Sequence, residues 1–371
     1  TFLPEIAVLR GVSIILVLFY HLQAPYFVSG YLGVDMFFII SGYLMALLYA
    51  ELPDRRAVFR YYRKRFDRVM PAYFVALVAT VGVSASLILP HELADVLRHA
   101  TWSAAMMPNI GFWMDNTYFD KGVFKPFLQF WSLGVEVQFY LVFPLIIYLY
   151  RRSPAAVFLL MLGSLAACFV VTGLSPKTSF FMMPLRLWEF LAGFFACTFA
   201  RSIPALPAAR LIGLAGLCLT VTLACISWDV ASHPKYMALS VCAATVAVIV
   251  FGLPDFVRAG PAGAVLQTVG KYSYSLYLTH FPVIVLYHYE PFAGLILGPN
   301  PPLVFAGLLA LSAALAFANY HLVETPFRHG RLGRYSIALY GGLAVCLIAA
   351  GPLVVAVQRS GFTAPQLLIL D

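Results

Sequence analysis

The chain has 371 residues, of which 62% are hydrophobic and 11% are charged, with a formal net charge of +8 at pH 7. This balance excludes a soluble domain of ordinary composition, in which about a quarter of the residues are charged. Apolar stretches of roughly 17 to 25 residues are long enough to cross the hydrocarbon core of a bilayer as helices. The sequence therefore predicts an all-α, polytopic bundle of transmembrane helices.

About eleven such stretches follow one another along the chain. The stretch 91–130 mixes charged and aromatic residues, and we expect it to form an interfacial or re-entrant segment. The predicted spans, in chain order, are residues 6–28, 31–50, 69–89, 131–150, 155–173, 182–200, 209–228, 236–252, 272–289, 302–321 and 336–357.

The basic residues predict the orientation of the bundle, because loops rich in Lys and Arg stay in the cytoplasm. If the N-terminus is cytoplasmic, the loops 51–68, 151–154, 201–210, 253–271 and 322–335 lie inside, and they hold 16 of the 24 Lys and Arg residues. With eleven spans, the C-terminus then lies on the periplasmic or extracellular side. We attribute the positive charge to this topology and expect no nucleic-acid partner. The six cysteines fall within predicted spans without metal-binding spacing, so no metal site is predicted.

The first span carries Arg10 and His21. Eleven helical steps are close to three turns, so both side chains leave one face about 16 Å apart. Ionisable groups inside a membrane usually face the bundle interior and suggest a functional path. The alternative is that Arg10 anchors the helix end and that His21 is a hydrogen-bonded core residue.

The second span adds a carboxylate and two small residues. His21 and Asp35 are each seven residues from the bend near Val28, so antiparallel helices would hold them at similar depth. Asp35 could then orient the imidazole of His21, as the partner of a general base does; alternatively, it caps the helix. Ser41 and Gly42 leave little side-chain volume, which allows close approach of a ligand or of another helix.

The following inside loop is strongly basic over residues 59–71. Arg65 and Arg68 are three residues apart, so on a helix they form one guanidinium face suited to phosphate or carboxylate. Topology and anionic membrane lipid offer an alternative explanation of the basic run.

Later spans supply further candidates. Glu136 is an acid within an apolar helix and needs a partner, for which an imidazole or arginine is expected; a structural tie to Arg186 or Lys125 is the alternative. Arg186 and Glu189 are three residues apart and are expected to pair with each other. The remaining candidates, which could shape an acceptor site, are Trp131, Ser132, Gln138, Tyr277 and His280. As alternatives, Trp131 could be an interfacial anchor and His280 a solvated histidine near the outer side of the membrane. Glu324 is expected to fix a helix end.

Taken together, these segments resemble the acyltransferase 3 family of integral membrane proteins. The resemblance extends over about 325 residues, and the order and spacing of the motifs make it specific. The matching motifs are Arg10 to His21, Gly33-Val34-Asp35-Met36-Phe37-Phe38 with Ser41-Gly42, Arg65-Phe66-Asp67-Arg68 with Pro71, residues 131–140, residues 272–282 and Val323-Glu324-Thr325-Pro326.

The resemblance implies transfer of an acyl group, commonly acetyl, from cytoplasmic acyl-CoA to a hydroxyl of a carbohydrate or similar acceptor. It identifies Arg10 and His21 as the basic residue and catalytic histidine of the family, and Arg65 and Arg68 as its paired arginines near the donor. We expect Asp35 and Glu136 to assist catalysis, Ser41 and Gly42 to lie at the donor, and the five remaining candidates to face the acceptor. His21 could act as a general base or as a covalent acyl carrier.

The resemblance also predicts the organisation and surroundings of the protein. Residues 1–335 form the family's transmembrane domain, whereas 336–371 add a further helix and the start of an extracytoplasmic tail, expected to lead to an SGNH-type domain. The expected partners are acetyl-CoA as donor substrate, a free or lipid-linked surface glycan such as peptidoglycan or lipopolysaccharide O-antigen, and the lipid of a bacterial inner membrane. The competing hypothesis is a transporter or flippase that uses Arg10, His21 and Glu136 as a proton relay.

Overall fold

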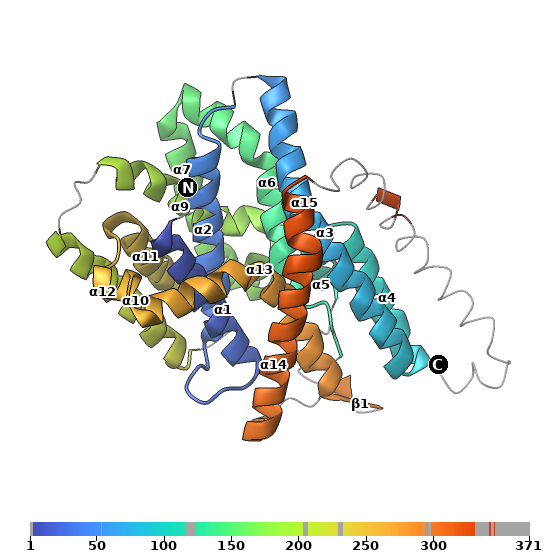
Figure 1. Ribbon diagram of the computed structural model, residues 1–371. Coiled ribbons are helices and arrows are strands. Elements are labelled where there is room, and N and C mark those ends of the chain that lie inside the picture. The colour runs from blue at the N-terminus through green and yellow to red at the C-terminus, as the bar shows by residue number, and fades with distance from the viewer. Residues whose placement is uncertain are drawn as a thin grey trace.

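The computed structural model describes residues 3–52, 54–115, 124–202, 207–228, 233–291, 294–295, 298–330, 341–342 and 345. Within these ranges the chain is almost wholly helical (Figure 1). One short antiparallel hairpin pairs β1 (Tyr289–Glu290) with β2 (Gly294–Leu295). The all-α prediction is thereby confirmed. The predicted eleventh span and the C-terminal part 336–371 lie almost entirely outside the described residues.

The helices lie around a central group made of α1, α2, α9 and α13. In chain order they are α1 (Pro4–His21), η1 (Gly30–Leu32), α2 (Gly33–Leu48), α3 (Arg55–Leu87), α4 (Pro90–Ala104), α5 (Pro108–Met114), α6 (Phe130–Arg152), α7 (Pro154–Leu174), α8 (Pro176–Phe181), α9 (Met183–Ser202), η2 (Pro207–Ala209), α10 (Arg210–Cys225), α11 (Tyr236–Phe251), α12 (Asp255–Arg258), α13 (Pro261–Tyr287), α14 (Pro302–Asn319), the π-helical turn η4 (Tyr320–Glu324) and α15 (Thr325–Arg328).

Ten of the eleven predicted spans coincide with helices. Among the described residues, six helices are long and apolar enough to cross a membrane, namely Pro4–His21, Gly30–Leu48, Arg55–Leu87, Phe130–Arg152, Pro154–Leu174 and Pro302–Arg328. The helices α10 and α11 are also apolar but have 16 residues each. The chain is therefore a multi-pass membrane protein.

Two segments differ from the expectation. The basic run was predicted as a loop, but it lies within α3, whose N-terminus is capped by the Asp54 carboxylate accepting from the Ala57 amide (2.6 Å). Arg and Lys are good helix formers, so a capped helix continues through them. The stretch predicted as interfacial or re-entrant contains α4 and α5, and neither helix is a candidate membrane span.

A proline helps to join α3 to α6. Pro144 lies inside α6 and has no amide hydrogen, so the carbonyl of Tyr140, four residues earlier, lacks its helical donor. The Tyr61 hydroxyl of α3 donates to this carbonyl over 2.9 Å and satisfies it. Tyr62 donates in the same way to the Leu141 carbonyl (2.8 Å). These two hydrogen bonds therefore hold α6 against the basic part of α3 at the turn that Pro144 interrupts.

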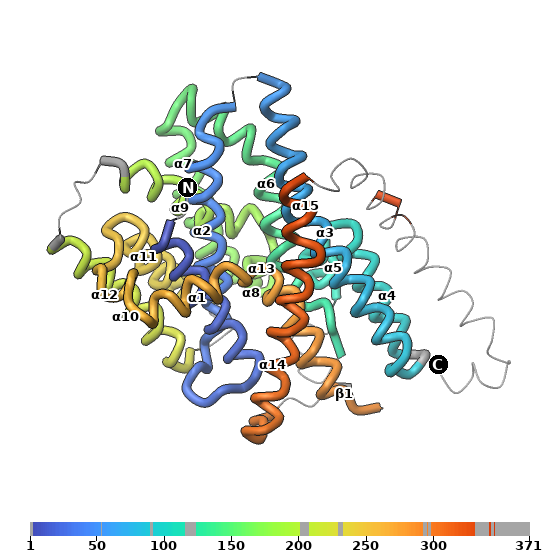
Figure 2. The backbone as a smooth tube through the Cα atoms, in the orientation of Figure 1, coloured from blue at the N-terminus to red at the C-terminus, as the bar shows by residue number. Residues whose placement is uncertain are grey.

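Glycines allow two close helix crossings at the centre. A Cβ atom on Gly42 of α2 would lie 1.8 Å from the Phe190 carbonyl oxygen of α9, and one on Gly193 would lie 1.9 Å from that of Ile39. The pair α1 and α13 is equally close, because a Cβ on Gly270 would lie 2.1 Å from the Ala7 carbonyl oxygen. Figure 2 shows α13 crossing α1 near the middle of the molecule. Small residues permit such backbone contact between membrane helices.

Candidate active site

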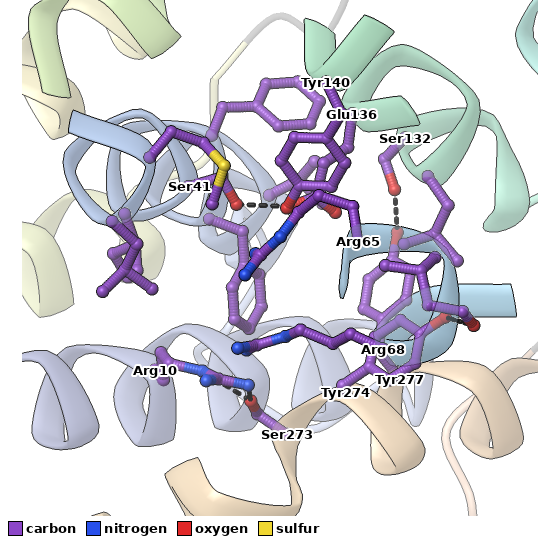
Figure 3. A pocket seen from close by; sticks show the side chains of 18 residues that line it. Arg10, Ser41, Arg65, Arg68, Ser132, Glu136, Tyr140, Ser273, Tyr274 and Tyr277 are labelled. Carbon is purple, nitrogen blue, oxygen red and sulfur yellow. Dashed lines mark hydrogen bonds between the residues drawn. The ribbon is translucent and has the colours of Figure 1, made fainter. Parts of the chain in front are cut away.

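A cavity of about 750 Å³, its mouth included, lies between α1, α2, α3, α6 and α13. Its polar lining brings together Arg10, Ser41, Arg65, Arg68 and Glu136, which come from four different helices (Figure 3). With Ser132 and Tyr277, which also line the cavity, seven of the residues predicted from sequence face one space. The remainder of the lining is mostly apolar, as expected for a ligand site built within a helical bundle.

Three guanidinium groups dominate the charge of this cavity. Arg10 donates from Nε and Nη2 to Ser273 Oγ over 3.1 and 2.9 Å, and Arg65 donates from Nη2 to the Tyr49 hydroxyl over 3.0 Å. Arg68 points into the same space beside Arg65. Within the described part of the chain, none of the three forms an ion pair with a carboxylate. The cavity is therefore strongly positive.

Glu136 is the acid of the cavity, and its direct partners are hydroxyl groups. Ser41 Oγ and the Tyr140 hydroxyl both donate to Oε1 of its carboxylate. The expected imidazole or arginine partner is therefore wrong for Glu136 among the described residues. The alternative of a structural tie to Arg186 or Lys125 is also wrong, because Arg186 binds other carboxylates and Lys125 lies 3.4 Å from Asp115. The carboxyl group of Glu136 is therefore held by two hydroxyl groups inside the cavity that the three arginines line.

A further acid lies close to the cavity, and sequence reasoning assigned it only to a helix end. Glu324 is 3% exposed, sits in η4 and accepts from Ser275 Oγ over 2.8 Å. Its charge acts on Arg10 and Arg68. The signal that could have identified it was an acid near the end of an otherwise apolar span, the same signal that identified Glu136.

His21 is paired with His280. Nδ1 of His21 lies 3.1 Å from Nε2 of His280, and Nδ1 of His280 lies 3.0 Å from the Leu276 carbonyl oxygen. His280 is fully buried, whereas His21 is partly exposed. The expectation of a solvated histidine at the outer interface is thus wrong for His280. Because Arg10 and His21 contact Ser273 and His280 of α13, the prediction that they share one helix face is confirmed.

Tyr277 connects the histidine pair to the cavity. Neither histidine is among the described residues that line the cavity, but Tyr277 lines it and its ring centroid lies 5.6 Å from that of His280. The Tyr277 hydroxyl is fixed by Ser132 Oγ at 2.6 Å and by the Gln129 carbonyl at 3.0 Å. Two of the predicted acceptor residues, Ser132 and Tyr277, are therefore hydrogen-bonded to each other at the cavity, and Tyr277 also contacts His280.

Asp35 does not pair with His21. Its two oxygens bind Arg186 and Nε2 of His233 (3.0 Å), and Arg186 also contacts Glu189 at 2.7 Å. The four side chains are at most 2% exposed. The prediction failed because equal depth on two helices does not fix the direction in which a side chain points around its helix. Burial lowers the pKa of the His233 imidazole, against the opposing effect of the Asp35 carboxylate.

The remaining predicted residues are not among the described residues that line the cavity. Trp131 is 7% exposed and packs on Phe180 with ring centroids 4.3 Å apart, so it is not an interfacial anchor. Gln138 donates to Asn109 Oδ1 over 2.9 Å. For Gly42 the helix-packing alternative is confirmed, since the Phe190 backbone occupies the space beside it.

Comparison with known proteins adds the following. A family model described as an acyltransferase domain matches residues 3–321. The O-acetyltransferase OatA of Staphylococcus aureus is 29% identical over 355 residues, covering 88% of this chain and 57% of the relative. The peptidoglycan O-acetyltransferase OatA of Listeria monocytogenes is 28% identical over 357 residues, covering 88% and 56%. The "Putative membrane-bound transacylase BcsY" of Komagataeibacter xylinus is 31% identical over 335 residues, covering 85% and 80%.

The chain spans a little over half the length of the two OatA proteins. No solved structure matches it.

Proposed function

The chain belongs to this acyltransferase family, and from that premise we propose that it moves an acyl group, most simply acetyl, from cytoplasmic acyl-CoA to a hydroxyl of a surface glycan. The protein would act in a bacterial inner membrane with its N-terminus in the cytoplasm, as the basic loops favour. The names of the relatives support O-acetylation, since two are O-acetyltransferases and one is named for peptidoglycan.

The observation that carries the proposal is the cavity with three guanidinium groups and no ion-paired carboxylate among its described lining. Coenzyme A is an anion because of its phosphates, and Arg binds phosphate through planar, paired hydrogen bonds. Arg65 and Arg68 lie on the part of α3 predicted to face the cytoplasm, where the donor is dissolved. The apolar remainder of the lining suits the uncharged arm that carries the thioester.

The proposed chemistry places the reacting centre beyond Tyr277, at the His21 imidazole. His21 would take the proton of the acceptor hydroxyl while the hydroxyl oxygen attacks the thioester carbonyl carbon. The carbon–sulfur bond then breaks, the ester remains on the acceptor, and the proton on His21 passes to the sulfur of CoA. In the covalent variant, His21 itself attacks the thioester carbon, and the carbon–sulfur bond breaks with CoA leaving as the thiolate. The acceptor hydroxyl then takes the acyl group from His21, and its proton passes to the thiolate.

The test is release of free CoA thiol from acetyl-CoA by the purified chain in nanodiscs, with and without a crude surface-glycan fraction. His21→Ala is expected to abolish release, and the double substitution Arg65→Gln with Arg68→Gln is expected to raise KM for acetyl-CoA by at least about tenfold, through loss of charge-assisted phosphate contacts. Arg60→Gln is the matched control, because Arg60 is an exposed arginine of the same helix outside the cavity.

The outcomes separate the hypotheses. Thiol release that vanishes in His21→Ala supports the acyltransferase. If acetyl-CoA binds but no condition releases CoA, the use of CoA thioesters as donors is refuted. If acetyl-CoA does not bind at all, the anionic-donor assignment of the cavity is refuted and the transporter hypothesis takes its place.

A further inference from the structure

His280 has no part in the chemistry described so far, although it is buried against the proposed catalytic histidine. Sequence reasoning placed it at the acceptor site, but it is 0% exposed and is not among the described residues that line the cavity. Among the described residues, Nδ1 of His280 faces the Leu276 carbonyl oxygen at 3.0 Å, and Nε2 faces Nδ1 of His21 at 3.1 Å. This geometry constrains where the protons of both rings lie.

The constraint begins at the backbone. A carbonyl oxygen can only accept a hydrogen bond, so Nδ1 of His280 must carry a hydrogen. In a neutral imidazole the other nitrogen is then an acceptor, which leaves Nε2 of His280 with a lone pair. The partner atom, Nδ1 of His21, must therefore be the donor. With both rings neutral, the remaining nitrogen of His21, Nε2, has no hydrogen and presents its own lone pair.

We propose that His280 is a positioning residue that holds His21 in the Nδ1–H form and so keeps Nε2 of His21 free as the base or nucleophile. The proposal rests on the proposed function, in which His21 reacts, and adds the residue that selects the reacting atom. The chain of contacts runs from the Leu276 carbonyl through His280 to His21. The contacts between α13 and α1 therefore determine which ring nitrogen of His21 carries the hydrogen.

The same contact assists the proton transfer. When Nε2 of His21 accepts the proton of the acceptor hydroxyl, the ring becomes an imidazolium, and its Nδ1–H bond to His280 becomes a charge-assisted hydrogen bond. The proton then leaves Nε2 for the sulfur of CoA, and the ring returns to the Nδ1–H form. His280 gains and loses no proton in the cycle; it supplies one acceptor atom throughout.

The first arm of the test reads the tautomer directly and needs no activity. The full chain, with ¹⁵N-labelled histidine, is placed in lipid bilayers for solid-state NMR, and the His21 signals are assigned by their absence in His21→Gln. We expect a protonated Nδ1 and an unprotonated Nε2 for His21 in the wild type, and loss of this pattern in His280→Leu. A wild-type His21 protonated at Nε2 and bare at Nδ1 would overturn the proposal.

The second arm measures kinetics on the same proteins. Removing the group that orients a catalytic histidine costs up to about 10⁴-fold in kcat in the best-known triad, so we expect His280→Leu to lower kcat by about 100-fold or more, with KM for acetyl-CoA changed less than about threefold. His280→Gln offers an amide oxygen that can accept from Nδ1 of His21, and it should recover at least about a tenth of the wild-type kcat. Recovery by Gln separates orientation from mere filling of space.

His288→Leu is the matched control, because His288 lies just after α13 and Nδ1 of His288 makes the same kind of bond to the Ile284 carbonyl (2.9 Å) without facing His21. It should keep wild-type kcat. Full activity in a His280→Leu protein that unfolds at the wild-type temperature would refute the positioning role. If wild type and His21→Ala are equally active or inactive, the proposed function fails instead, and the NMR arm still decides the tautomer.

Discussion

Replacing Gly42 by Ala is expected to destabilise the protein by separating α2 from α9. The added Cβ would lie 1.8 Å from the Phe190 carbonyl oxygen, whereas real Cβ contacts begin near 3.0 Å. The two helices would have to separate by about 1 Å or more along this direction, and overpacking of this kind costs about 1–3 kcal/mol. The contacting atom is backbone, so no side chain can rotate away to relieve the clash. Gly42→Ala should therefore lower the unfolding temperature in nanodiscs measurably.

Gly163→Ala is the matched control for this measurement. Gly163 also lies inside a helix, α7, but a Cβ there would meet nothing within 4 Å. Alanine is the better helix former by about 1 kcal/mol, so this variant should be as stable as the wild type or more stable. The two variants differ only in the space around the new methyl group. Equal stability of Gly42→Ala and Gly163→Ala would refute the reasoning from helix contact.

Three further predictions concern charge and hydrogen bonding. Arg186→Met leaves Asp35 and Glu189 buried without their cation and should cost about 3–5 kcal/mol, measured by denaturant unfolding in detergent; stability within 1 kcal/mol of wild type would contradict it. Tyr61→Phe removes the donor to the Tyr140 carbonyl beside Pro144 and should cost about 1–3 kcal/mol in the same assay, whereas an unchanged midpoint would mean that water replaces the hydroxyl. Glu136→Gln makes the cavity more positive and should tighten binding of acetyl-CoA by about three- to tenfold in calorimetric titration at low salt; weaker binding would assign the carboxylate to donor contact.

The sequence predicted the helices well because membrane spans follow from composition and length. It also identified Arg10, Arg65, Arg68 and Glu136, since a charge within an apolar or membrane-bordering helix needs a special environment. These four side chains line one cavity. That cavity forms where five helices converge, and the depth of residues along their spans predicted only part of this arrangement.

The partners of the ionisable groups were harder to predict. Asp35 was expected beside His21 and instead meets Arg186 and His233, which is 198 residues away in the chain. His280 was ranked as solvated and instead lies against His21, 259 residues away. Each pairing depends on how one helix is rotated about its own axis. Successive side chains lie about 100° apart around a helix, so a shift of one residue changes the partner that a side chain faces. Spacing within one segment, as for Arg186 and Glu189, was predictable because it needs no such information.

The contrast between two groups of arginines gives the strongest physical argument for a binding cavity. Arg186 is fully buried and is neutralised by Asp35 and Glu189, which is how this protein satisfies an arginine that only ties helices together. Arg10, Arg65 and Arg68 also lie within the bundle, but their described neighbours are mainly hydroxyl groups and aromatic rings. Hydroxyls orient a guanidinium without cancelling its charge. The three guanidinium groups outnumber the two nearby acids, Glu136 and Glu324, and the net positive charge that remains in a low-dielectric region is costly. An anionic ligand that enters the cavity would remove this electrostatic cost. The free energy regained in this way would contribute to the free energy of ligand binding.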